Sequence, residues 1–123
     1  MHSESDHIGE LGHLLDKGFS LQDYQTSQTL ELLSKINQKQ IDIVVCINEK
    51  PSNSDSEHLR FLHLLGYVDK LFQYIQGNSS LGGDSRVLRF HTLTKRRLEQ
   101  LLGEIEDRCY VRAKLQRHHP DIM

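Results

Sequence analysis

Histidine is the residue type here that most directly raises a question of chemistry, since eight histidines occur in 123 residues. Glu10 and His13 are three residues apart, the spacing with which one helix supplies two ligands to a di-iron carboxylate site. A second Glu-x-x-His pair is absent, and one pair supplies too few ligands. His58 and His63, five residues apart, would point to different faces of a helix. We therefore expect no metal site and no cofactor.

The cysteines are candidates for nucleophilic catalysis, and their surroundings argue against it. Cys46 and Cys109 each lie within an apolar run, whereas a catalytic thiol needs an electropositive, partly exposed setting. The sequence contains no Gly-x-Ser-x-Gly turn, phosphate-binding loop or dinucleotide fingerprint. We expect reduced, buried thiols, no catalytic residue and no enzymatic activity.

Basic residues near the C-terminus are the remaining candidates for a binding site. The residues that could contact a nucleic acid or an acidic partner are Lys95, Arg96, Arg97, Arg108, Arg112, Lys114 and Arg117. Such residues could follow phosphates, and binding would then weaken steeply with salt. Acidic residues are interleaved with them, which is more typical of a solvated or partner-facing helix. Nucleic-acid binding is thus the alternative to protein binding.

Composition indicates one ordinary globular domain spanning residues 1–123. Hydrophobic residues make up 37% and charged residues 26% of the chain. The net charge of −2 is unevenly distributed: residues 1–85 carry 6 Lys/Arg against 12 Asp/Glu, and residues 86–119 carry 9 against 4. This asymmetry indicates either a basic binding tail or two halves that attract each other, and we favour the second.

The N-terminus is polar and acidic, without a basic region ahead of an apolar stretch, and no apolar run reaches 18 residues. We therefore expect no signal peptide, no membrane span and no membrane partner. A cytoplasmic location is the corresponding expectation.

The first half of the chain contains one short helix and one ambiguous segment. Apolar spacing predicts a helix over residues 6–17. Ser20 is a plausible start for the next helix, whose face would include Leu30, Leu33, Ile41 and Val44. Residues 41–47 are also rich in β-branched residues and could pair as a strand with residues 86–91. We favour one long helix, because two isolated strands make a marginal sheet.

The second half of the chain has the strongest helical pattern. The inner positions expected between Asp55 and Gln76 are Phe61, Leu64, Val68, Leu71 and Ile75, widened by Leu65 and Phe72. Residues 86–90 are either a short extended piece or the first turn of the last helix, which Thr92 or Thr94 could cap. The stripe expected on that helix is Leu98, Leu102, Ile105, Cys109 and Ala113.

Together these patterns predict an all-α protein, an antiparallel bundle of three to four helices, with a small α/β arrangement as the alternative. Loops are expected at residues 51–55 and 77–85, with frayed ends at 1–5 and 118–123. The function that we expect is non-enzymatic: a helical protein–protein interaction module such as a small adaptor, complex subunit or chaperone-like protein. Its partner would be another protein, bound through amphipathic, coiled-coil-like helices, or a second copy of itself.

Overall fold

The computed structural model describes residues 4–21, 26–49, 55–78 and 80–118, and almost all of them are helical. The elements are α1 (Glu4–Phe19), α2 (Thr26–Glu49), α3 (Asp55–Asn78), the short 3₁₀-helix η1 (Ser80–Gly83) and α4 (Ser85–His118). The prediction of an all-α helical bundle is confirmed. Residues 1–3, 51–54 and 119–123, which include most of the expected frayed ends and linker, lie outside the described residues.

The alternative with a small sheet is wrong, because both proposed strands lie within helices. Residues 41–47 belong to α2, and residues 86–91 form the first turns of α4. Within α2, Ile43 and Ile47 are buried while Ile41 is exposed, as a helical period requires. β-branched residues lose some side-chain freedom in a helix, and the burial of these isoleucines offsets that cost.

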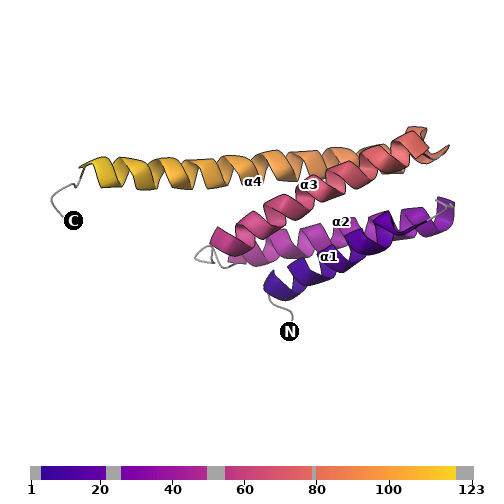
Figure 1. Cartoon of the computed structure of the whole chain (residues 1–123), viewed down its shortest axis with the longest axis horizontal. Coiled ribbons are helices and arrows are strands. Elements are labelled where there is room, and N and C mark those ends of the chain that lie inside the picture. Colours follow the sequence, from indigo (N-terminus) through magenta and orange to yellow (C-terminus); the bar gives the residue numbers. More distant parts are fainter. Residues whose placement is uncertain (1–3, 22–25, 50–54, 79, 119–123) are drawn as a thin grey trace.

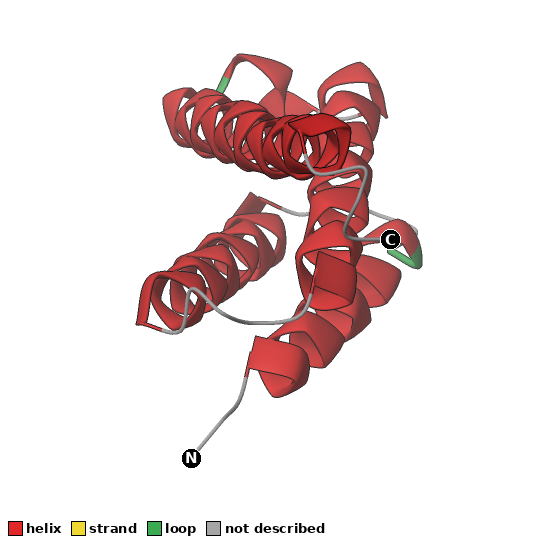
Figure 2. Cartoon of the chain, turned by 90° about the vertical axis from the view of Figure 1, so that its left-hand side faces the viewer, coloured by secondary structure: helices red, strands yellow, loops and turns green. Residues whose placement is uncertain are grey.

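The four helices form two antiparallel hairpins that pack on each other, α1 with α2 and α3 with α4 (Figure 1). Between the hairpins, α1 packs on α3 and α2 packs on α4. Each helix therefore has two main neighbours around a common centre, as the view along the helices shows (Figure 2). The 34-residue α4 is the longest helix, and its last turns extend past the ends of α2 and α3 (Figure 1).

The core consists of residues that recur at alternating steps of three and four along each helix, which keeps them on one face. In α2 these buried residues are Thr29, Leu33, Ile36, Gln40, Ile43 and Ile47. In α3 they are His58, Phe61, Leu65, Val68, Phe72 and Ile75. The predicted seam of α3 is thus confirmed, except that Leu64 is only partly buried.

No described helix combines the length and the apolar character needed to cross a membrane.

The predicted inner faces of α2 and α4 were partly wrong in register. In α2, Leu33 is buried as expected, but Gln40 lies in the core and Ile41 does not. In α4, Leu101 is 5% exposed and Leu102 is 42% exposed, so the buried leucine is the neighbour of the predicted one. The side chains at positions 109 and 113 lie outside the described part.

The helix ends differ from the expected caps. Thr92 and Thr94 do not cap α4, because that helix begins earlier, at Ser85. The cap is Asp84, whose Oδ1 accepts the backbone N–H of Arg86 at 2.8 Å. Ser20 serves the end of α1 and not the start of α2: its hydroxyl donates to the carbonyl oxygen of Asp16 at 2.7 Å.

The expected loop at residues 77–85 is largely ordered by η1. Its Leu81 is buried against the core, with 3% exposure. A Cβ at Gly82 would lie 2.7 Å from the carbonyl oxygen of Gln76, so this close approach of η1 to α3 requires glycine. The connection through η1 therefore keeps the end of α3 close to the start of α4.

Candidate functional site

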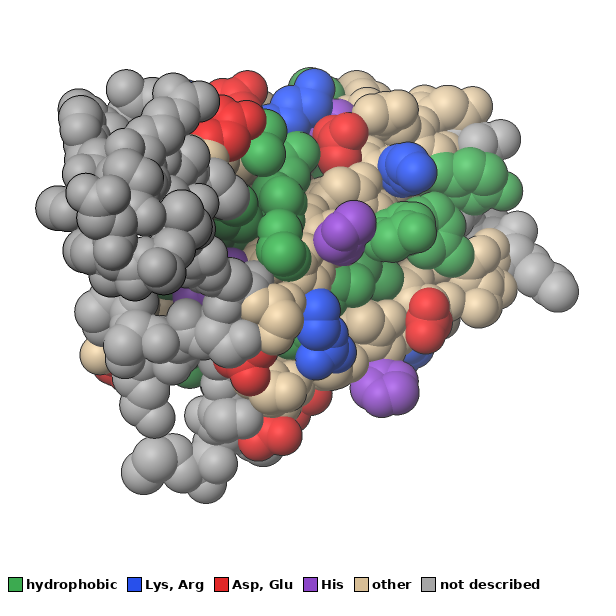
Figure 3. Space-filling view, turned by 60° about the vertical axis from the view of Figure 1, so that its left-hand side comes forward, with side chains coloured by type: hydrophobic (Ala, Val, Ile, Leu, Met, Phe, Trp, Pro, Cys, Tyr) green, Lys and Arg blue, Asp and Glu red, His purple; other side chains and the backbone are tan. Residues whose placement is uncertain are grey.

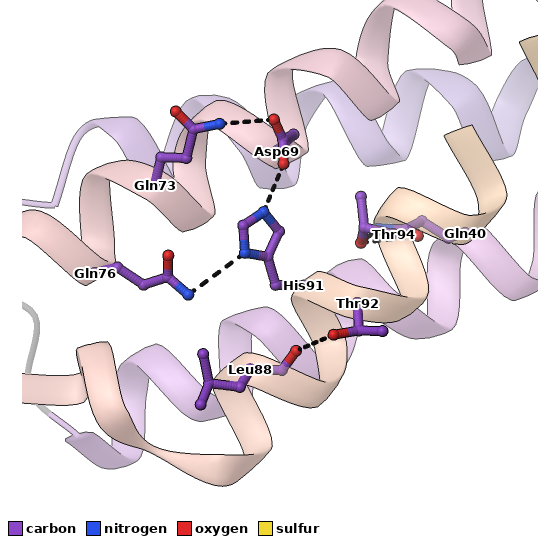
Figure 4. Close-up of polar contacts among 8 residues, drawn as sticks. All are labelled: Gln40, Asp69, Gln73, Gln76, Leu88, His91, Thr92 and Thr94. Carbon is purple, nitrogen blue, oxygen red and sulfur yellow. Dashed lines mark hydrogen bonds and ion pairs between the residues drawn. The ribbon is translucent and has the colours of Figure 1, made fainter. Parts of the chain in front are cut away.

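A buried histidine joins α3 to α4. Nε2 of His91 lies 2.5 Å from Oδ1 of Asp69, and Nδ1 lies 3.4 Å from Nε2 of Gln76 (Figure 4). Gln73 donates to the other carboxylate oxygen of Asp69 at 2.8 Å, and the imidazole stacks on Phe72 with ring centroids 5.0 Å apart. In a catalytic Asp–His pair the second imidazole nitrogen faces a nucleophile. Here it faces an amide, so the arrangement holds two helices together.

A second polar cluster joins α2 to α4. The buried side chains of Gln40 and Thr94 are hydrogen-bonded, with 3.1 Å between Nε2 and Oγ1 (Figure 4). Nη1 of Arg97 donates to Oδ1 of Asn37 and to Oε1 of Gln40, at 2.7 Å each. Burial lowers the pKa of Arg97, but an arginine stays protonated in a folded protein. Two amide oxygens of α2 thus accept hydrogen bonds from the guanidinium group of α4.

A third polar cluster joins α1 to α2. Nζ of Lys39 pairs with the carboxylate of Glu10 and lies 3.2 Å from Nδ1 of His7 and 3.6 Å from Oδ2 of Asp42. Glu10 is therefore held in an ion pair, while His13, its expected companion, is exposed. A surface groove of ≈ 530 Å³ borders this cluster, with charges of both signs around it.

Among the side chains that the structure describes, His58, His63 and Cys46 do not come together. His58 is fully buried and His63 is exposed, so they occupy different faces of α3 as their spacing predicts. Cys46 is partly buried in α2, and the side chain of Cys109 lies outside the described part. Where side chains are described, no three His, Cys, Asp or Glu residues are grouped so that they could hold a metal ion.

The basic candidates on α4 do not share one orientation. Lys95 and Arg96 are exposed, whereas Arg97 points inward to α2. The side chains of the remaining candidates, Arg108, Arg112, Lys114 and Arg117, lie outside the described part. A role for this set in binding nucleic acid or an acidic partner stays a prediction.

The exposed side of α4 is a candidate for contact with another molecule. We call it the outer face of α4, and it comprises Leu88, Arg89, Thr92, Lys95, Arg96, Glu99, Leu102, Gly103 and Glu106. Leu88 is 45% exposed and Leu102 is 42% exposed. They are 14 residues apart, close to four helical turns, and therefore lie on the same side of the helix. A Cβ at Gly103 would meet nothing within 4 Å, so the surface is open there.

Exposed apolar side chains also occur on α1 and α3. Phe19, Leu59, Tyr67 and Tyr74 are each about half exposed. Tyr67 is covered in part by the ammonium group of Lys70, 5.2 Å from the ring centroid. On the face drawn in Figure 3, hydrophobic side chains form patches between Lys/Arg, Asp/Glu and histidine side chains. Phe19 and Tyr67 line one surface groove together with Leu64, whereas single exposed apolar residues such as Leu59 are common on protein surfaces.

The sequence patterns did not predict the Asp69–His91 and Gln40–Thr94 contacts. The signal that could have found them is position, since His91 and Thr94 follow the buried Val87 at steps of four and three residues. Polar residues at such inward positions need partners on a facing helix. Comparisons of the chain with models of known protein families, with curated proteins and with solved structures found no match.

Proposed function

We propose that this protein is a non-enzymatic helical interaction module, a small adaptor, complex subunit or chaperone-like protein, whose outer face of α4 receives a helix of another chain. The observation that carries the proposal is a long helix that exposes Leu88 and Leu102 and extends past its neighbours (Figure 1). With 34 residues α4 is about 51 Å long, against about 36 Å for the 24-residue α2 and α3.

The physical basis is the recognition of one amphipathic helix by another, which uses apolar anchors at helical spacing within a polar surround. Burying an exposed leucine fully contributes roughly 1.5–3 kcal/mol. The outer face of α4 supplies two such anchors among charged side chains. The Arg97 and His91 contacts hold the opposite side of the helix against α2 and α3, which supports a preformed binding face.

The proposal is tested by affinity purification of the tagged protein from its native cell, followed by mass spectrometry. A Leu88→Glu/Leu102→Glu variant should lose the co-purifying protein, because each carboxylate would have to be buried in the interface. A Phe19→Glu/Leu59→Glu variant, which alters two similarly exposed sites on α1 and α3, is the matched control and should retain it. Identical sets of co-purifying proteins for all three forms would contradict the proposal.

A further inference from the structure

From Ser85 to Asp107, the part of α4 whose side chains the structure describes, the exposed charges are separated by sign along the helix. The exposed basic residues of its first part are Arg86, Arg89, Lys95 and Arg96. The exposed acidic residues that follow are Glu99, Glu104, Glu106 and Asp107. Arg97, the basic residue at the point where the sign changes, is directed inward to Asn37 and Gln40 and leaves the surface pattern intact.

When a second copy of this segment lies antiparallel to the first, its acidic part faces the basic part of the first copy, and the reverse. We infer that the helix received by the outer face of α4 is α4 of a second copy of this chain, packed antiparallel about a two-fold axis between residues 97 and 98. The inference rests on the proposed function and names its partner. In this arrangement Arg96 faces Glu99 of the second copy, and Arg89 faces Glu106 of the second copy. A parallel copy would place like charges opposite each other, which is unfavourable.

The same axis produces a regular line of contact. Residues at alternating steps of three and four lie along it, and four of the six are charged: Arg89, Thr92, Arg96, Glu99, Gly103 and Glu106. Thr92 then lies opposite Gly103 of the second copy, so small residues meet where the helices must approach closely. Leu88 and Leu102 both lie on one side of this line, where the second copy covers them in part. A two-fold contact of this kind uses the same surface twice and closes on itself.

Arg96 and Glu99, the charged pair next to the axis, are available for such a contact. Arg86 is engaged by Asp84 at 3.2 Å, and Glu104 accepts from Gln100 at 3.5 Å. By contrast, Arg96 and Glu99 form no ion pair with any other side chain that the structure describes. Their pairing across the axis therefore breaks no ion pair among the described side chains.

The test uses two charge reversals on the purified full chain, measured by sedimentation velocity and native mass spectrometry. Arg96→Glu places a carboxylate against Glu99 of the second copy, and Glu99→Arg places a guanidinium against Arg96 of the second copy. Each variant alone should weaken self-association at least tenfold. An equimolar mixture should form heterodimers, because both contacts across the axis are then between opposite charges. Arg60→Glu, an exposed reversal on α3, is the control and should dimerise like the unmodified chain.

Three results would overturn the inference: a monomeric unmodified chain at about 100 μM, dimers that both reversals leave unchanged, or a mixture that associates no better than its components. Circular dichroism of each variant shows that the helices are retained. If the chain is monomeric but Leu88→Glu/Leu102→Glu still loses its co-purifying protein, the second copy is the wrong partner and the proposed function stands. If the charge reversals leave self-association unchanged and Leu88→Glu/Leu102→Glu retains all co-purifying proteins, both the inference and the proposed function are contradicted.

Discussion

Asp84 shows how a single carboxylate can define where a helix begins. Its Oδ1 accepts the backbone N–H of Arg86, and its Oδ2 lies 3.2 Å from Nη2 of the same arginine. These side-chain and backbone hydrogen bonds from Arg86 hold the pKa of the Asp84 carboxyl below its ordinary value. The ionised form is therefore favoured in the folded protein.

We predict that Asp84→Asn lowers the melting temperature near neutral pH and that this difference disappears in acid. A carboxyl whose pKa is depressed by folding stabilises the folded state above its unfolded pKa of about 4, and this contribution is lost as the pH falls through the folded pKa. Melting curves of both proteins from neutral pH to well below pH 4 measure this. A difference that does not change with pH would mean that the ionised carboxylate contributes nothing.

Arg97 is the residue whose charge is used inside the molecule. Replacing it with alanine removes the donor to the amide oxygen of Asn37 and leaves that of Gln40 with only the Thr94 hydroxyl at 3.3 Å, so we expect Arg97→Ala to lower the free energy of unfolding by about 1–3 kcal/mol. Urea denaturation measures the loss. The exposed Arg60 is the control, and Arg60→Ala should change stability by less than about 0.5 kcal/mol. Equal effects would show that the contact with α2 stabilises nothing.

At the scale of the element, the register of α4 can be tested with two adjacent leucines. Leu101 is buried and Leu102 is exposed. At a protein concentration too low for self-association, Leu101→Ala should therefore lower the free energy of unfolding by about 2–5 kcal/mol, and Leu102→Ala by less than about 1 kcal/mol. Thermal denaturation of the pair decides this directly. A larger loss for Leu102→Ala than for Leu101→Ala would mean that Leu102 is the buried residue, as the sequence pattern predicted.

The central position of α3 leads to a similar prediction. Phe72 is 1% exposed and stacks on His91, so Phe72→Ala should lower the free energy of unfolding by about 3–5 kcal/mol. Tyr74, two residues on and 49% exposed, is the control, and its replacement by alanine should have a much smaller effect. A loss below about 1 kcal/mol for Phe72→Ala would mean that this face of α3 is not buried in solution.

At the scale of the whole molecule, one core is shared by all four helices. Each hairpin packs on the other along both of its helices, and side chains of α1, α2, α3 and α4 contribute to the same cluster. We therefore expect a single cooperative unfolding transition. Far-ultraviolet circular dichroism, which reports on all helices, and tyrosine fluorescence, to which Tyr67 and Tyr74 of α3 contribute, should give the same midpoint. Two separate midpoints would show that the hairpins unfold independently.

The sequence by itself determined that the chain is helical and which face of α3 is buried. Apolar residues recur with helical period around Phe61, Val68 and Phe72, and periodicity is a local property that a single chain segment displays. The same local information favoured a helix for residues 41–47. It was also sufficient to separate His58 from His63, because five residues along a helix change the face.

Only the tertiary structure decided which polar residues lie inside and which helices are neighbours. Whether Gln40 or Ile41 faces the core depends on whether another helix offers Gln40 a partner, and Thr94 lies more than fifty residues away in the chain. The same holds for Arg97, which pattern alone grouped with Lys95 and Arg96 as a surface cation. A buried polar group is stable only where a partner from elsewhere in the fold satisfies it, and that pairing is set when the two hairpins pack together.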